Sequence, residues 1–229
     1  MAVLITGGAR SGKSAFAEQY ARRIGSRGIY MATSRIWDEE MEERVALHRS
    51  GRETSGFEWH TMEEPLELAD AIARVGAEHA ADDPRLEPGA ELDKELELEP
   101  GLRGEPAAER NAESSPAPEA KPPVVLVDCL TLWLSNWLMK LEEEQLPESV
   151  LAEQYEKLAA AAAACPYPLL FVTNEVGDGV VPAYPLGRKF RDEAGRLNQL
   201  MARQCERVFL VTAGIPVELK AIAFQWENL

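Results

Sequence analysis

The chain contains the stretch Gly7-Gly-Ala-Arg-Ser-Gly12-Lys13-Ser14, which fits the pattern G-x-x-x-x-G-K-[ST] at every position. The apolar run Val3–Thr6 before it predicts a strand, and Lys13–Arg23 predicts a helix after it. The glycines let the backbone curl so that successive N–H groups point at phosphate oxygens, and the helix adds its positive N-terminal end. We therefore predict a nucleotide-binding loop, which we call the phosphate loop. It comprises Gly7, Gly8, Ala9, Arg10, Ser11, Gly12, Lys13 and Ser14.

Three side chains are candidates for handling phosphate charge. Lys13 is placed to reach the β- and γ-phosphates, and the Ser14 hydroxyl is placed to ligate Mg²⁺. Asp128 follows the apolar run Val124–Val127, and P-loop proteins use an aspartate at the end of a buried strand to hold Mg²⁺. The same aspartate also suits an N-cap of the next helix, and the two roles are compatible. We predict Lys13 as a catalytic residue and Ser14 and Asp128 as the metal site.

Outward from this loop, strands alternate with helices along the chain. The strands are short, continuous apolar runs, which is typical of strands buried on both faces of a parallel sheet. This alternation predicts an α/β fold of the P-loop NTPase type (RecA-like), with a mostly parallel sheet and helices on both faces. The predicted strands are Val3–Thr6, Gly28–Ala32, Phe57–Thr61, Val124–Val127, Leu169–Val172 and Val208–Val211. The predicted helices are Lys13–Arg23, Asp38–Arg49, Pro65–His79, Leu130–Glu144, Glu148–Ala164 and Arg188–Gln204.

Residues 82–123 differ in composition from the rest of the chain. They contain no aromatic residue and many Pro, Glu, Ala and Gly residues. Such a composition buries too little apolar area to offset chain entropy, so we predict a disordered surface insertion, with an acidic docking segment as the alternative. One domain is then formed by residues 1–81 and 124–220, and a tail follows at 221–229.

The net charge of −15 comes largely from one part of the chain. Residues 82–121 carry 12 acidic and 5 basic side chains, so the net charge of this segment is −7, nearly half of the total. The remainder is mildly acidic and indicates no nucleic-acid partner. No apolar run is long enough to span a membrane, and Met1–Thr6 is too short for a signal peptide, so we predict a cytoplasmic protein without a membrane partner. The three cysteines form no CxxC pair, which argues against a disulfide framework or a structural zinc site.

His48 stands at the end of an acidic predicted helix, directly before Arg49-Ser-Gly-Arg52. A neutral imidazole is a competent nucleophile toward phosphorus, and two nearby arginines suit the phosphates of an attacked nucleotide. A histidine at a helix C-terminus is also a common cap, so spacing alone leaves both roles open. Glu63 is a candidate for contacting a base or ribose, or for ordering a metal.

Several ordered blocks, in addition to the phosphate loop, resemble one enzyme family. The blocks are Thr6–Ser14, Tyr30–Ser34, Asp38–Met41, Arg44–Arg49, Trp59–Glu63, Asp128–Thr131 with Asn136, Val172–Gly177, Gly179–Pro182, Phe190–Asp192 and Gly195–Asn198. The sequence resembles the bifunctional adenosylcobinamide kinase/adenosylcobinamide-phosphate guanylyltransferases of cobalamin biosynthesis. The blocks run to about Lys220, and the ordered set is far more specific than a P-loop alone.

This resemblance implies two reactions. An NTP phosphorylates the hydroxyl of the aminopropanol arm of adenosylcobinamide. GTP then transfers GMP to an enzyme histidine, from which adenosylcobinamide phosphate takes it to give adenosylcobinamide-GDP. The resemblance implies Mg²⁺, with ATP and GTP as substrates, and a homotrimer. It matches His48 to the guanylylated histidine, and the nucleotide contacts beyond the loop to Ala32, Thr33, Ser34, Arg49, Ser50, Gly51, Arg52, Glu63 and Asp128.

The chain departs from the family pattern in four places. The insertion at 82–123 is long, and extra residues lie between Arg52 and Glu63. Asp128 stands where some members carry Glu, and the tail at 221–229 passes the usual end. None of these differences removes a group that the chemistry requires.

Two other functions are compatible with the residues. One is a different P-loop small-molecule kinase in which His48 is only a helix cap, and the other is a non-enzymatic nucleotide switch.

The stretch Thr173–Pro182, with Arg188, Arg191 and Arg196, is a candidate for the corrinoid side or a subunit contact, and solvation of a surface helix is the alternative.

Overall fold

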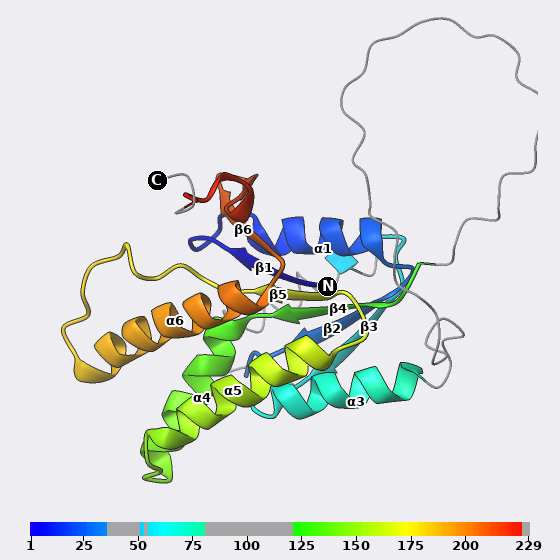
Figure 1. The fold of residues 1–229 in the computed structure, drawn as a ribbon. Coiled ribbons are helices and arrows are strands. Elements are labelled where there is room, and N and C mark those ends of the chain that lie inside the picture. The colour runs from blue at the N-terminus through cyan, green and yellow to red at the C-terminus, as the bar shows by residue number, and fades with distance from the viewer. Residues whose placement is uncertain (36–50, 53–54, 81–120, 226–229) are drawn as a thin grey trace, which may run out of the picture.

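The structure is a computed structural model that describes residues 1–35, 51–52, 55–80 and 121–225, and its centre is a seven-stranded sheet (Figure 1). The strand order is β3-β2-β4-β5-β1-β6-β7. Neighbouring strands are parallel except for β7, which runs antiparallel to β6. This arrangement confirms the predicted mostly parallel α/β fold. The strands are β1, Ala2–Thr6; β2, Gly28–Ala32; β3, Trp59–Glu63; β4, Val124–Asp128; β5, Leu169–Val172; β6, Arg207–Thr212; and β7, Ile215–Glu218.

Helix α1, Lys13–Ile24, covers one face of the sheet, and the other described α-helices cover the opposite face (Figure 1). Side chains alternate along each strand, so Val3 and Ile5 join the cluster with Ala17 of α1, whereas Leu4 joins the cluster on the other face. Both faces are therefore buried, which confirms the prediction from the continuous apolar runs. The helices of the second face are α3, Leu68–Ala80; α4, Leu130–Glu143; α5, Ser149–Ala164; and α6, Pro185–Gln204.

Helix α3 begins at Leu68, later than the predicted start at Pro65. The Glu64 carboxylate explains the difference, because its Oε1 accepts the N–H of Leu66 at 3.2 Å and the N–H of Glu67 at 2.9 Å. These bonds fold the stretch into a turn before the helix begins. A carboxylate that binds nearby N–H groups in this way competes with helix formation.

Strand β3 also begins later than the strand predicted at Phe57–Thr61. The N–H of Phe57 bonds to Ser55 Oγ at 3.3 Å, so this residue belongs to a turn. Pairing with β2 begins where Trp59 lies opposite Gly28. A Cβ on that glycine would lie 2.2 Å from the Trp59 ring, so the register depends on a glycine at this position.

Two elements at the C-terminal end differ from the prediction. Helix α6 begins at Pro185 rather than Arg188, because proline suits the first turn of a helix, where its missing N–H costs nothing. Strand β7 has no counterpart in the prediction, since Gly214 and Pro216 are weak strand formers. Pro216 is tolerated because β7 is the edge of the sheet.

Two predicted segments lie outside the described residues: the helix at 38–49 and the insertion as far as residue 120. The tail predicted at 221–229 is described to residue 225, and its start belongs to a short 3-10 helix, Lys220–Ile222. Within the described ranges, no helix has both the length and the apolarity that crossing a membrane would need.

Candidate nucleotide-binding site

The carboxyl ends of neighbouring strands bring three predicted site residues to one level of the sheet. Ala32 at the end of β2 is paired with Glu63 of β3 on one side and with Asp128 of β4 on the other. Asp128 is paired in turn with Val172 of β5, which is opposite Ile5 of β1. Because the phosphate loop follows β1, the loop and the three residues share this edge of the sheet.

Two glycines give the phosphate loop its shape. Gly7 passes so close to β6 that a Cβ on it would lie 2.4 Å from the Val211 carbonyl oxygen. Gly12 has a φ of 93°, in the left-handed region that glycine adopts without strain. Lys13 is buried and its Nζ donates to the Gly8 carbonyl oxygen at 3.2 Å, so the ammonium group lies over the loop. This is the geometry expected of a lysine that meets phosphates in the loop.

Two other segments hold the phosphate loop in place. The N–H of Glu175, which follows β5, donates to the Gly7 carbonyl at 3.1 Å. The N–H of Gly214, in the β6–β7 turn, donates to the Ser11 carbonyl at 2.8 Å. The loop is therefore fixed on both sides by backbone bonds, one on the β5 side of β1 and one on the β6 side.

Asp128 is half-buried, and its Oδ2 accepts a hydrogen bond from the Tyr30 hydroxyl at 3.2 Å. Burial, followed by the charge of Asp128, holds the pKa of Tyr30 well above its usual value, so the phenol stays a neutral donor. Cys129, rather than Asp128, is the N-cap residue of α4, so the interpretation of Asp128 as that cap is wrong. Carboxylate and hydroxyl oxygens are ligands that Mg²⁺ prefers, so Asp128 and Ser14 fit a magnesium site.

Arg52 lies on the α1 side of the sheet, away from the solvent. Its guanidinium is 3.6 Å from the centroid of the Tyr30 ring, and its Nη1 is 3.7 Å from Oε1 of Glu18 on α1. The Tyr30 phenol thus connects Arg52 to Asp128. The phosphate contact predicted for this arginine stays a prediction.

A set of buried and half-buried side chains links the strand ends to α4, and we call Thr33, Cys129, Thr131, Asn136 and Asn174 the strand-end network. The Thr33 hydroxyl donates to the Cys129 carbonyl at 2.7 Å and accepts the Cys129 N–H at 2.9 Å. Asn136 Nδ2 donates to the Thr33 carbonyl at 2.8 Å and to the Pro65 carbonyl at 3.0 Å. These bonds tie the residues that follow β2, β3 and β4 to one helix. The nucleotide contact predicted for Thr33 stays a prediction beside this observed linking role.

The network continues to β5 through Asn174. Its Nδ2 donates to Thr131 Oγ1 at 2.7 Å, and its carbonyl accepts from Asn198 of α6 at 3.1 Å. The Cys129 sulfur lies 3.0 Å from the same Thr131 oxygen, and burial raises the pKa of this thiol to about 11. Cys129 is therefore a neutral packing residue, and an improbable nucleophile at neutral pH.

Sequence reasoning assigned no role to Asn136, and it included Asn174 only as part of the stretch Thr173–Pro182, without this linking role. Two signals pointed to them: Asn136 interrupts an otherwise apolar stretch of α4, and Asn174 follows a buried strand almost directly. The predicted site residues His48, Arg49 and Ser50 lie outside the described residues, whereas Gly51 is described and exposed. Ser34 is half-buried and follows Thr33 at the same edge of the sheet.

Comparison with known proteins assigns the chain to a family. The family model described as cobinamide kinase / cobinamide phosphate guanyltransferase matches residues 3–82 and 107–219. The chain belongs to this family. The resemblance inferred from the sequence blocks is thereby confirmed. The family match leaves out residues 83–106, inside the predicted insertion, and residues 220–229, which include the predicted tail at 221–229.

Curated relatives match the chain over almost its whole length. The bifunctional adenosylcobalamin biosynthesis protein CobP of Pseudomonas aeruginosa is 36% identical over 217 residues, which is 95% of this chain and 96% of that protein. The CobU protein of Escherichia coli, with the same description, is 34% identical over 230 residues, 96% of this chain and 100% of that protein. A type III secretion ATPase of known structure is 11% identical to this chain, with a TM-score of 0.45. The match covers 99% of this chain and 59% of that chain.

Proposed function

We propose that this member of the family catalyses both steps: phosphorylation of adenosylcobinamide by an NTP, and transfer of GMP from GTP to the resulting phosphate. The observation that carries the proposal is the phosphate loop with Lys13 folded over it, beside strand ends that present Asp128 and Glu63 at one level. In a chain of this family, that edge is the natural place for both nucleotides. The product is adenosylcobinamide-GDP.

In the kinase step, the arm hydroxyl of adenosylcobinamide attacks the γ-phosphorus of the NTP and the bond from that phosphorus to the β–γ bridging oxygen breaks. The nucleoside diphosphate leaves, and the hydroxyl proton passes to water. Lys13 and the backbone N–H groups of the loop neutralise charge on the transferred group, which is where most catalysis of phosphoryl transfer arises. Asp128 and Ser14 would hold Mg²⁺, which would supply positive charge to neutralise the phosphates. Tyr30 keeps the Asp128 carboxylate in position through its hydroxyl.

In the guanylyl step, a neutral His48 nitrogen attacks the α-phosphorus of GTP and pyrophosphate leaves. The phosphate of adenosylcobinamide phosphate then attacks the same phosphorus, the P–N bond breaks, and the histidine is regenerated. Arg49 and Arg52 would neutralise the phosphates, with Ser50 and Gly51 contacting them through the backbone. For Arg52 this contact requires the guanidinium to leave its position on Tyr30 and near Glu18.

The test of this function is intact-protein mass spectrometry after incubation with GTP and Mg²⁺. We expect a mass increase of one GMP on the wild-type protein, and none on His48→Ala. The variant should keep most of its kinase activity, because direct phosphoryl transfer needs no enzyme nucleophile. Phosphorylated product without an adduct would leave a plain small-molecule kinase. Nucleotide binding without any transfer would leave a nucleotide switch.

The cellular location and the oligomeric state are part of the same proposal. We expect it to act in the cytoplasm and to form a homotrimer. Sedimentation equilibrium measures the assembly directly, and a monomer would contradict the second expectation.

A further inference from the structure

The loop between β5 and α6 and the first turn of α6 carry exposed apolar side chains, which we call the acceptor patch: Val180, Val181 and Tyr184 in the loop, and Leu186 in the helix. Val180 is 95% exposed, Val181 is 59% exposed and Tyr184 is 64% exposed. Figure 1 shows this loop, in yellow, projecting beyond the carboxyl ends of the strands before the chain turns into α6. Several large apolar side chains gathered at one exposed place commonly mark a binding surface.

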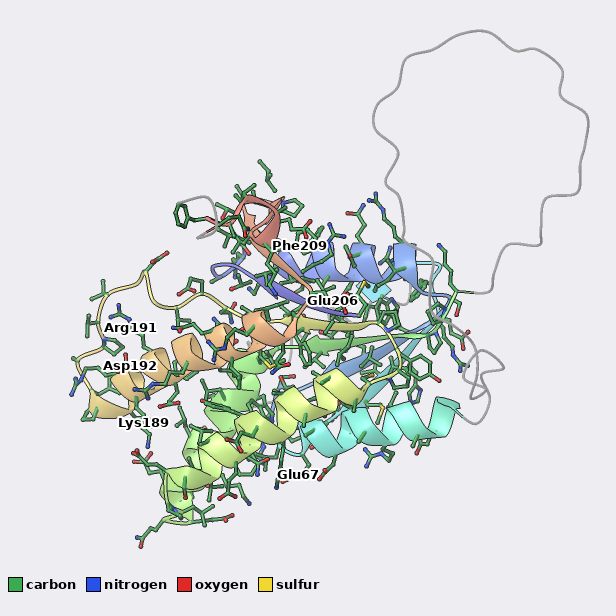
Figure 2. All side chains as sticks on the ribbon, in the orientation of Figure 1. Glu67, Lys189, Arg191, Asp192, Glu206 and Phe209 are labelled. Carbon is green, nitrogen blue, oxygen red and sulfur yellow. The ribbon has the colours of Figure 1, made fainter. Side chains whose placement is uncertain are left out.

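Polar bonds hold the backbone of this loop in a defined shape. Oε1 of Glu175 accepts the N–H of Gly177 at 2.6 Å, and Arg191 donates to the Gly177 carbonyl at 2.5 Å. Arg188 donates to the carbonyls of Pro182, at 3.1 Å, and Ala183, at 2.7 Å. Figure 2 shows Arg191 rising from α6 toward the loop. The arginines thus support the loop from α6, while the apolar side chains of the patch are exposed.

The loop begins on the Asp128 side of the phosphate loop. Strand β5 lies between β1, which leads to the phosphate loop, and β4, which ends at Asp128. The Glu175 N–H bonds to Gly7 on this side. The exposed Ile215 and Val217 of β7 lie on the other side of β1, beyond β6. Of these two groups of described residues, the acceptor patch is the one on the Asp128 side.

We propose that the acceptor patch binds the corrin ring of adenosylcobinamide, an inference that rests on the proposed function. The arm hydroxyl must reach the γ-phosphate in the phosphate loop, but the ring is too large to follow it and must lie outside. A corrin ring carries methyl groups and amide arms around its rim. Its apolar surface suits Val180, Val181 and Leu186, and Tyr184 offers both an aromatic face and a hydroxyl for an amide. Because the loop is held in shape beforehand, little ordering opposes binding.

The experiment compares Tyr184→Ala and Val180→Ser with wild type in the kinase step, with adenosylcobinamide as the varied substrate. We expect its KM to rise about tenfold for Tyr184→Ala, as for a buried aromatic anchor, and about threefold for Val180→Ser. The amount of GMP adduct formed from GTP alone should not change, because that step does not involve the corrinoid. Ile222→Ser is the matched control, since Ile222 is 70% exposed but lies beyond β7, and its KM should equal that of wild type.

The outcomes separate this inference from the function on which it rests. If wild type does not phosphorylate adenosylcobinamide, the proposed function fails. If wild type does so and both patch variants keep the wild-type KM, the acceptor patch is not the corrinoid site. Sedimentation of the same variants tests the alternative occupant, a second copy of the chain. Dissociation of the assembly, with or without a change in KM, would make the patch a subunit contact and overturn the proposal. Val180 is so exposed that its substitution leaves folding intact, so the test holds even if Tyr184→Ala does not fold.

Discussion

The phosphate loop and the strand-end network lie at the same edge of the sheet but are built in opposite ways. The loop is one continuous stretch whose shape depends on backbone bonds and on glycines such as Gly7 and Gly12. The network joins Thr33, Cys129 and Asn136, which are far apart in the chain, through buried side-chain bonds. Because of this difference, we expect substitutions in the loop to affect catalysis first. Substitutions in the network should affect the free energy of unfolding first.

The largest expected effect is on the chemistry of the loop. Lys13→Ala removes the cation that neutralises the transferred phosphate, so we expect the kinase kcat to fall by about 10³-fold. The free energy of unfolding should change little, since the observed bond of this lysine is one contact to Gly8. Steady-state kinetics and urea unfolding measure both quantities. A variant that loses stability but keeps its turnover would reverse the contrast between the two regions.

Asn136→Ala tests the network at the residue that joins most segments. The change leaves the Thr33 and Pro65 carbonyls without their donor, so we expect the free energy of unfolding to fall by about 2 kcal/mol. Lys140→Ala, on the same helix, removes only a surface ion pair with Glu144 and should cost about 0.5 kcal/mol or less. Equal losses in the two variants, measured by urea unfolding, would show that the network adds no stability.

Thr33→Val gives a smaller effect with a closer control. Valine has nearly the same shape but cannot exchange hydrogen bonds with the backbone of Cys129, so we expect a loss of about 1 kcal/mol. Thr33→Ser keeps the hydroxyl and loses only a methyl group. If Thr33→Ser proves as unstable as Thr33→Val in urea, packing rather than hydrogen bonding explains the position.

The stability of the network should also depend on alkaline pH. Burial, followed by the charge of Asp128, raises the pKa of Cys129 from 9.0 to about 11, so above pH 9 the unfolded chain releases a proton that the folded chain retains. The free energy of unfolding should therefore fall as pH rises from about 9 to about 11. Cys129→Ala should show a shallower fall over this range. Identical pH profiles would show that this thiol does not contribute.

The smallest effect is expected from a change outside both the phosphate loop and the strand-end network. Replacing residues 83–106, which the family match leaves out, with a short Gly/Ser linker should change Tm and kinase activity little. Differential scanning calorimetry and kinase assays measure the two quantities. A large fall in Tm would mean that this segment packs on the domain and would contradict the predicted insertion.

Sequence patterns were sufficient wherever a feature depends on neighbouring residues. The loop between β1 and α1 was predicted because its glycines, lysine and flanking strand and helix follow one another in the chain. The buried strands were predicted because sheet faces covered on both sides require continuous apolar runs. The position of Asp128 at the end of a buried strand was predicted for the same reason, since it follows such a run.

Tertiary packing was needed wherever residues distant in sequence meet. The alignment of Glu63, Ala32 and Asp128 depends on strand register, which in turn depends on the Trp59 ring packing over Gly28. The position of Arg52 on Tyr30 depends on packing between segments that are far apart in the chain, and so does the hydrogen bond that Asn136 donates to Thr33. Local propensity carries no information about such pairs, because the free energy that selects them arises only when the sheet and its helices pack together.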